Sequence, residues 1–303
     1  MNEHIPKISV FIACKNGREY LRETLDSIFN QTFQDFEIVL LDGESTDDTI
    51  DILKSYKDTR LRWISEQDND ANEGYYKALM KTRGEYVMPI AISDGYVDMD
   101  WFRKCADFLD NDINISLVYA NLYDVRFNGK RVLSFPDWVN KPPPSGKDFF
   151  LFWLATRSII PDPTYCVRST VFKKCFPVIK NVTFDFENPP DPMTDDYFET
   201  HNPWYKFIFN FIKSGYLPKY LPVAASYGRW HKDARNFKWP LFFKEIEKKY
   251  AEYVSELMKD FLSGDYVHHY RDGNSRVIGK TSKNSLLISK IKIMVYRAFN
   301  RTF

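Results

Sequence analysis

The chain lacks the features that would assign it at once to several protein classes. Among its 303 residues are only four cysteines, with no CxxC pair and no nearby histidine at metal-binding spacing, so neither a zinc site nor a disulfide framework is expected. The formal net charge is +1, which gives no reason to expect nucleic acid as a partner. No run of about 18 apolar residues is present to span a bilayer, and the N-terminal apolar run is too short for a signal peptide. We therefore expect a soluble or peripheral protein in a reducing compartment, the cytoplasm.

Apolar, β-prone runs alternate with helical patterns over the first 110 residues. Hydrophobic residues make up 44% of the chain, enough for a large core in one big domain or two modest ones. The expected strand and helix pairs are residues 8–13 and 18–31, 36–41 and 47–57, 61–65 and 71–83, and 85–93 and 99–110. This alternation predicts a mostly parallel, Rossmann-like α/β sheet with helices on both faces.

The second half of the chain is less regular. A β-hairpin is expected over residues 115–126 and 130–135, split by Asn128-Gly129. A proline-rich loop at residues 136–147 then marks a soft boundary. Beyond it the pattern predicts a helix at 148–156, a strand at 164–168, a helix at 195–214 and a last strand at 217–225.

Two acidic residues follow buried strands, at Asp42 and Asp94. In an open parallel sheet the carboxyl ends of the strands form the ligand crevice, so both carboxylates should line one edge. Asp42 suits the N–H of a nucleotide base or a ribose hydroxyl, although it can equally serve only to cap the turn that follows it. Asp94 suits a divalent metal bound to a diphosphate, or else it belongs to an ordinary turn with Gly95.

Two segments carry a resemblance to a known family. Residues 7–53 read KISVFIACKNGREYLRETLDSIFNQTFQDFEIVLLDGESTDDTIDIL, and residues 65–94 read SEQDNDANEGYYKALMKTRGEYVMPIAISD. In order and spacing they resemble the family 2 glycosyltransferases, which depend on sugar nucleotides and have the GT-A fold. The resemblance is dense over about the first 100 residues and looser over residues 160–235.

The resemblance implies roles for particular residues. It implies a nucleotide-binding set of Ala13, Lys15, Asn16, Asp42, Gly43, Asp68, Lys77 and Ser93. In this set Ala13 and Asp42 contact the base and Asp68 helps to close the pocket. Asp94 binds Mn2+ or Mg2+ on the diphosphate, and His231 completes the metal shell or binds phosphate, unless it only packs beside Trp230.

The resemblance also places the catalytic base in the segment from Thr194 to Glu199. Attack by a sugar hydroxyl needs a base within hydrogen-bond reach, and Asp196 is the first choice, with Asp195 next. Paired acids at a helix start are also explained by the helix dipole alone.

Several residues depart from the family pattern. Ile92 stands where the first acid of the Asp-x-Asp motif is usual, and Gly95 replaces the acid that often follows the second. Asp70 replaces the glycine of Asp-Asn-Gly, and Glu44 replaces the second glycine of Asp-Gly-Gly-Ser. These changes indicate a weak metal site or an altered donor sugar.

We therefore predict an inverting glycosyltransferase of the bacterial polysaccharide type, such as lipopolysaccharide or capsule synthesis. It should move a sugar from a nucleoside diphosphate sugar, with a UDP-sugar favoured, to a hydroxyl of a glycan or lipid-linked glycan. The predicted parts are a nucleotide-sugar-binding half at residues 1–135, an acceptor-binding and catalytic-base half at 136–235, and a C-terminal helical extension at 236–303.

Two other functions remain open. The first is a catalytically weakened sugar-nucleotide or glycan-binding protein on the same fold, motivated by the lost acid at Ile92. The second is a nucleotidyltransferase. Such an enzyme would need a glycine-rich loop bearing Lys or Arg after the first strand, and Lys15-Asn16-Gly17-Arg18 is a poor match to such a loop.

The C-terminal segment has a charge pattern of its own. From residue 273 to residue 303 there are seven basic residues and no acid, and residues 284–303 carry an apolar stripe at helical spacing. Such a basic amphipathic helix can lie on an anionic membrane, which would hold the enzyme at the inner face of the cytoplasmic membrane. The alternative is that the stripe docks on the protein's own core.

Overall fold

The computed structural model describes residues 4–133, 162–179 and 203–231. It also describes Lys248, Leu287 and two short strands, β10 (Val267–His269) and β11 (Ser275–Val277), which pair antiparallel with each other. The predicted loop at 136–147, the helix at 148–156, the catalytic pair Asp195 and Asp196, and all but Leu287 of the C-terminal basic helix lie outside the described residues. The same holds for both predicted domain boundaries, which stay predictions.

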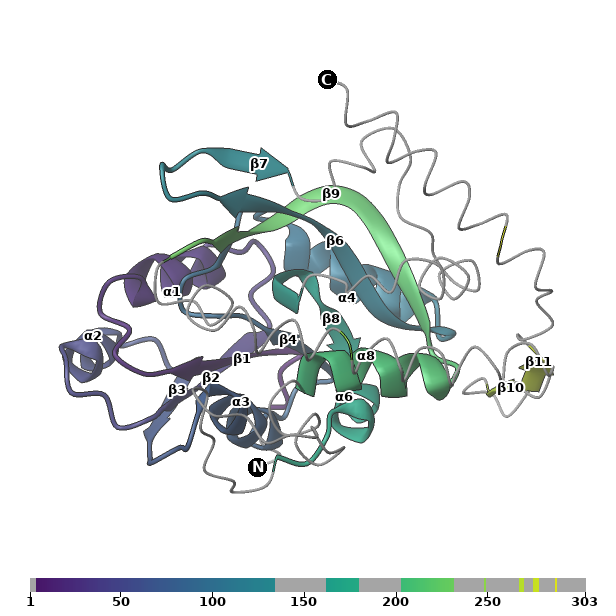
Figure 1. The fold of residues 1–303 in the computed structure, drawn as a ribbon, viewed down its shortest axis with the longest axis horizontal. Helices are drawn as coiled ribbons and strands as arrows, with labels where there is room; N and C mark the ends of the chain where they lie inside the picture. The colour runs from purple at the N-terminus through teal and green to yellow at the C-terminus, as the bar shows by residue number, and fades with distance from the viewer. Residues whose placement is uncertain are drawn as a thin grey trace.

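Nine of the described strands form one sheet, in the order β3-β2-β1-β4-β8-β6-β9-β5, with β7 paired to β6 (Figure 1). Their bounds are β1 (Ile8–Cys14), β2 (Phe36–Asp42), β3 (Leu61–Ser65), β4 (Tyr86–Pro89), β5 (Gly95–Tyr96), β6 (Ile115–Val125), β7 (Arg131–Leu133), β8 (Cys166–Arg168) and β9 (Leu217–Arg229).

The first four strands are parallel, as the βα alternation predicts. β1 pairs with β2 from Ile8↔Phe36 to Cys14↔Asp42, and all seven residues of each strand are buried. Continuous apolar strands of this kind are typical of a sheet covered on both faces. The register brings Cys14 and Asp42 to the same edge, where the loops that follow both strands begin.

The second half of the sheet is mixed. β8 runs antiparallel to both β4 and β6, β9 runs parallel to β6, and β5 runs antiparallel to β9. The predicted hairpin is confirmed, because β7 pairs antiparallel with the end of β6. The predicted strand at 85–93 is too long: β4 ends at Pro89, a last N–H of Ile90 donates to Phe11 O of β1 at 3.3 Å, and the chain then turns before β5.

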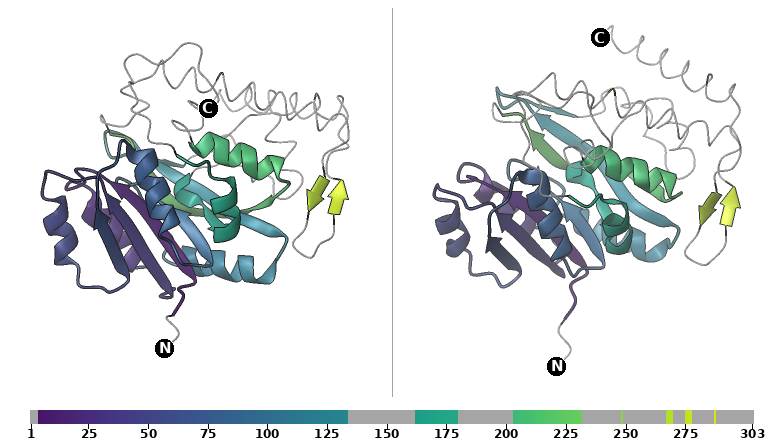
Figure 2. Two further views of the ribbon diagram at one scale, coloured as in Figure 1. Left: turned by 90° about the horizontal axis from the view of Figure 1, so that it is seen from below. Right: turned by 60° about the horizontal axis from the view of Figure 1, so that its bottom comes forward.

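Helices cover both faces of the sheet (Figure 2). Their bounds are α1 (Leu21–Phe29), α2 (Thr49–Ser55), α3 (Ala71–Met80), α4 (Trp101–Asn111), α6 (Ser169–Cys175) and α8 (Pro203–Lys213), with a 3-10 helix η2 (Asp162–Thr164) before β8. Helix α6 was not expected from the sequence.

The two faces can be told apart by two aromatic residues. Phe11 of β1 packs against Tyr75 of α3 and Phe172 of α6. Phe36 of β2 lies in register with Ile8 and so faces the opposite way, where it meets α1 and α4. The α/β architecture with helices on both faces is therefore confirmed.

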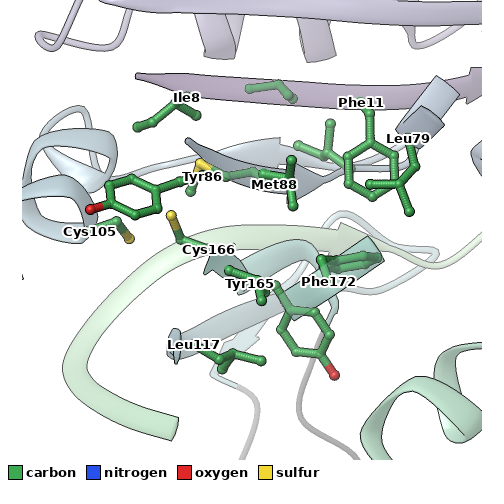
Figure 3. Close-up of a cluster of buried hydrophobic side chains, with 14 of the residues drawn as sticks. Ile8, Phe11, Leu79, Tyr86, Met88, Cys105, Leu117, Tyr165, Cys166 and Phe172 are labelled. Atoms are coloured by element: carbon green, nitrogen blue, oxygen red, sulfur yellow. The ribbon is translucent and has the colours of Figure 1, made fainter. Parts of the chain in front are cut away.

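The core is continuous across both halves of the sheet. Figure 3 shows Ile8, Phe11, Tyr86 and Met88 from the first half beside Leu117, Tyr165, Cys166 and Phe172 from the second. Burial of each large apolar side chain contributes roughly 1.5–3 kcal/mol. All four cysteines are buried and free, in agreement with the absence of a disulfide framework. Within the described residues, no helix is long and apolar enough to cross a bilayer.

Candidate functional site

The candidate site lies at the carboxyl ends of β1, β2 and β3, where hydrogen bonds join the loop after β1 to the loop after β2. The N–H of Asn16 donates to Ser45 Oγ at 2.8 Å, and Asn16 Oδ1 accepts from the N–H of Thr46 at 2.9 Å. The N–H of Gly17 donates to Thr49 Oγ1 at 2.8 Å. Asn16 has a φ of 53°, in the left-handed region that asparagine tolerates better than most residues. Asn16 therefore orders both loops, through its backbone and its side chain.

Asp42 ends β2, is fully buried, and accepts hydrogen bonds from the turn that follows it and from the end of β3. Oδ2 accepts from Ser65 Oγ at 2.7 Å and from the N–H of Ser45 at 3.1 Å, and Oδ1 accepts from the Ser45 hydroxyl. The N–H of Gly43 donates to Cys14 O at 2.8 Å and joins the two strand ends. These are the contacts of the turn-capping alternative, and contact of Asp42 with a base stays a prediction.

Asp68 follows β3 and packs closely against two glycines. A Cβ added at Gly43 would lie 2.6 Å from Asp68 Oδ2, and one added at Gly74 of α3 would lie 2.9 Å from the same oxygen. The Gly74 position is also 3.0 Å from the Cβ of Ala13. Three predicted site residues, Ala13, Gly43 and Asp68, thus meet at one place, and only glycine at positions 43 and 74 permits this approach.

The carboxylate of Asp68 is poorly solvated. Burial raises the pKa of Asp68 to about 6; Lys15 and Lys77 oppose this, while Asp70 and Glu73 add to it. Within the part of the chain that the structure describes, the Asp68 carboxylate accepts no hydrogen bond. A buried carboxylate without a donor is suited to accept a hydrogen bond from a ligand N–H or O–H.

Lys77 of α3 holds the loop that carries Asp68. Its Nζ donates to Gln67 O at 2.6 Å and pairs with Glu73 Oε1 at 3.0 Å. Glu73 Oε2 in turn accepts from the N–H of Asn69 at 2.8 Å. Lys77 is therefore engaged in ordering the loop, and its predicted contact with the nucleotide stays a prediction.

Asp94 lies in the turn between β4 and β5 and is anchored from three sides. Thr24 Oγ1 of α1 shares its hydrogen between Ile92 O at 2.8 Å and Asp94 O at 2.7 Å. The N–H of Arg229, at the end of β9, donates to Asp94 Oδ1 at 3.0 Å. Ser93 Oγ lies 3.4 Å from the same oxygen. The turn is thus built by contacts from both halves of the fold.

The second carboxylate oxygen of Asp94 is available. Burial raises the pKa of Asp94 to about 7 and the nearby charge of Asp162 adds to this, while the N–H of Arg229 opposes it. Among the described residues Asp94 Oδ2 has no hydrogen-bond donor. One free carboxylate oxygen fits a hard divalent cation, because such an ion often takes one or two protein carboxylates and completes its shell with water and phosphate.

The rest of the predicted metal site is sparse. Ile92 packs on the loop after β1, where a Cβ at Gly17 would lie 3.1 Å from Ile92 Cδ1. His231 lies beside Tyr20, with 6.1 Å between ring centroids. No group of three metal-ligating side chains occurs within the residues that the structure describes. The weak metal site that Ile92 predicts stays a prediction.

Sequence reasoning missed Thr24, Asp162 and the backbone of Arg229 as neighbours of Asp94. Arg229 stands two residues before His231, which the sequence had singled out, but the pairing of β5 with β9 was not predicted. No local pattern indicates that Thr24 reaches across to residues 92 and 94.

The chain is similar to known proteins in both sequence and structure. The family model described as glycosyl transferase family 2 matches residues 9–169, just over half of the chain. Chondroitin synthase of Escherichia coli is 27% identical over 138 residues, which is 45% of this chain and 20% of that protein. An uncharacterised glycosyltransferase of Methanocaldococcus jannaschii is 30% identical over 174 residues, 56% of this chain and 58% of that protein. The chain thus spans less than two thirds of each of these relatives.

Two solved structures share the fold. S. aureus TarS, as residues 1–349 in complex with UDP-GlcNAc, has a TM-score of 0.58 at 18% identity, covering 98% of this chain and 74% of that one. A mannosyltransferase of Pyrobaculum calidifontis, in complex with GDP-Man and Mn2+, has a TM-score of 0.51 at 13% identity, covering 98% of this chain and 84% of that one. At these identities the likeness concerns the fold alone, and it confirms the predicted fold class.

Proposed function

Because this chain belongs to glycosyl transferase family 2, we propose that it transfers a sugar from a nucleoside diphosphate sugar to an acceptor hydroxyl, with inversion. The observation that carries the proposal is the meeting of Ala13, Gly43 and Asp68 at the same sheet edge as the turn that bears Asp94. Both carboxylates are buried, and each keeps at least one oxygen without a donor among the described residues.

The nucleotide fits the Asp68 side of this edge. The buried carboxylate of Asp68 accepts the N–H of a base or a ribose hydroxyl, and Lys15 supplies a nearby positive charge. We favour a uridine nucleotide, and the complex of TarS with UDP-GlcNAc supports that choice. The mannosyltransferase complex with GDP-Man makes a guanosine nucleotide the first alternative to test.

The diphosphate fits the Asp94 side. Asp94 Oδ2 would hold Mn2+ or Mg2+, with His231 as a further ligand, and the Mn2+ in the mannosyltransferase complex supports this assignment. A bound divalent ion neutralises the charge that develops on a leaving diphosphate. With Ile92 in place of an acid, we expect the ion to bind weakly until the nucleotide brings its own phosphate oxygens.

The assignment of the residue that activates the acceptor rests on the sequence. We propose that Asp196, with Asp195 as the alternative, removes the proton from an acceptor hydroxyl on the face opposite the diphosphate. The acceptor is a glycan or a lipid-linked glycan, and the relative named chondroitin synthase supports a glycan. We place the enzyme at the cytoplasmic face of a membrane, held there by residues 284–303.

The test is nucleotide binding by calorimetry on the full chain, with UDP and GDP, each with and without Mn2+. We expect UDP to bind more tightly when Mn2+ is present, and Asp94→Asn to abolish that Mn2+-dependent gain. Asp107→Asn is the matched control, because Asp107 is exposed on α4 away from the site. An Asp94→Asn variant that keeps the full Mn2+ dependence would contradict the metal assignment, and absence of nucleotide binding by the wild type would contradict the proposed function.

A second candidate function is a catalytically weakened sugar-nucleotide or glycan-binding protein. The observation that favours it is the packing of Ile92 where an acid is usual. Hydrolysis of UDP-GlcNAc and GDP-Man by the purified protein separates the two: release of free sugar supports the transferase, and binding without any release supports the binding protein.

A further inference from the structure

We propose that Glu23 is a positioning residue that aligns Asp94 through Arg229, an inference that rests on the proposed role of Asp94 at the diphosphate. Glu23 lies on α1, far along the chain from both Asp94 and Arg229. Figure 1 shows the end of β9 beside that helix.

A continuous chain of contacts joins the two carboxylates. The Nη2 of Arg229 lies 2.7 Å from both Glu23 Oε1 and Glu23 Oε2, and the hydroxyl of Tyr227 donates to Glu23 Oε1 at 2.6 Å. The backbone N–H of Arg229 donates to Asp94 Oδ1 at 3.0 Å. Arg229 is therefore held by Glu23 through its side chain while it holds Asp94 through its main chain.

Glycine makes this close approach possible. A Cβ at Gly95 would lie 2.6 Å from the hydroxyl oxygen of Tyr227, so a side chain at this position would displace the Tyr227 ring. Gly95 and Tyr227 face each other in the antiparallel pairing of β5 and β9. The acid that the family often has at this position would thus displace the tyrosine that Glu23 binds.

The guanidinium of Arg229 depends on Glu23 for its charge partner. It stacks 5.1 Å from the ring of Tyr20 and 5.4 Å from that of Tyr227, and its buried Nε has no partner among the described residues. Of the carboxylates in the described residues, Glu23 is the one within ion-pair distance of this guanidinium. Without the charge of Glu23, the guanidinium is free to turn to Asp94, where it would compete with a cation for Oδ2.

The backbone of the turn does not depend on Glu23. Thr24 Oγ1 fixes the carbonyl groups of Ile92 and Asp94 independently. The Glu23 side chain is itself 50% exposed, so its substitution should leave the fold intact. Substituting Glu23 should therefore change the orientation of the Asp94 carboxylate and leave the folded structure intact.

The experiment compares UDP binding with and without Mn2+ in the full chain, by calorimetry, and follows free Mn2+ by electron paramagnetic resonance. Substituting residues that orient a metal ligand typically lowers metal affinity about 10- to 100-fold. We expect Glu23→Gln to lower the Mn2+-dependent gain in UDP affinity about tenfold and to leave Mn2+-free UDP binding unchanged. Glu19→Gln, an exposed acid just before α1, is the matched control and should change neither.

A double-variant cycle tests the route through Arg229. If Glu23 acts through that guanidinium, Glu23→Gln with Arg229→Gln should be no weaker in Mn2+-dependent binding than Glu23→Gln alone. Additive losses, an unchanged Mn2+ dependence in Glu23→Gln, or equal losses with and without Mn2+ would each overturn the inference. Asp94→Asn separates the two proposals: if it too leaves the Mn2+ dependence unchanged, the proposed role of Asp94 has failed, whereas a loss in Asp94→Asn alone overturns only the role of Glu23.

Discussion

Replacing Asp68 by Asn should make the protein more stable at alkaline pH while weakening nucleotide binding. The Asp68 residue is 9% exposed, and burial raises its pKa from 3.8 to about 6. At 1.36 kcal/mol for each pKa unit, the ionised carboxylate costs the folded state about 3 kcal/mol. Asn keeps the shape of the side chain but carries no charge, so it removes this cost.

The sign of the pH dependence follows from proton linkage. Between about pH 4 and pH 6 the folded state binds a proton at Asp68 that the unfolded state has released, so the free energy of unfolding falls as pH rises and is level above pH 6. The advantage of Asp68→Asn over the wild type should therefore be about 3 kcal/mol at pH 8 and about 1 kcal/mol at pH 4.5.

Urea unfolding at the two pH values measures this difference, with Asp107→Asn as an exposed control that should match the wild type at both. Calorimetry on the same variant should show UDP affinity lowered roughly tenfold or more, because a hydrogen bond to a charged acceptor contributes about 1.5–3 kcal/mol. An Asp68→Asn variant that is no more stable than the wild type at pH 8 would refute the conclusion that the Asp68 carboxylate is poorly solvated. A more stable variant that binds UDP normally would refute only its role in the nucleotide pocket.

Four further predictions concern separate parts of the chain. Glu44 is exposed with a φ of 54°, so Glu44→Gly should raise the free energy of unfolding by about 0.5–1 kcal/mol, measured by urea unfolding, whereas Glu44→Ala should give no gain. Thr24→Val should lower the free energy of unfolding by about 1–3 kcal/mol because the buried carbonyl of Asp94 and the part-buried carbonyl of Ile92 lose their donor, and Thr24→Ser should restore most of that loss. Asp196→Asn should lower turnover by roughly two to four orders of magnitude with donor binding unchanged; if Asp195→Asn is the inactive variant instead, the base is one position earlier. The full chain should pellet with anionic but not neutral vesicles and be released by salt, and a chain ending at Asp272 should not; equal pelleting of both would exclude the C-terminal helix.

The order of strands and helices in the first half could be predicted from the sequence because its signals are local. Apolar runs such as β2 and helical spacing such as that of α1 are encoded within about ten residues, and Asp-Gly or Asn-Gly turns separate them. The placing of Asp42 and Asp94 at one edge follows from the same alternation, since parallel strands share their carboxyl ends.

The role of Asp42 could not be settled from the sequence. Both a ligand contact and a turn cap suited its position after β2. In the structure its carboxylate accepts hydrogen bonds from Ser45, in the turn that follows it, and from Ser65 at the end of β3, while its contact with a base stays a prediction. The neighbouring Asp68 was predicted only to help close the pocket, yet of these two carboxylates it is the one without a hydrogen-bond donor in the described part of the chain.

The mixed half of the sheet and the surroundings of Asp94 depended on tertiary structure alone. The antiparallel insertion of β8 and the pairing of β5 with β9 join segments that are far apart, and no local period reports such a pairing. The ion pair of Glu23 with Arg229 spans 206 residues. The sequence by itself determined the family, the parallel sheet and the edge at which Asp42 and Asp94 lie, because these follow from short-range patterns and motif order. The tertiary structure decided which side chains at that edge are free to bind, because burial and long-range partners exist only once the chain has folded.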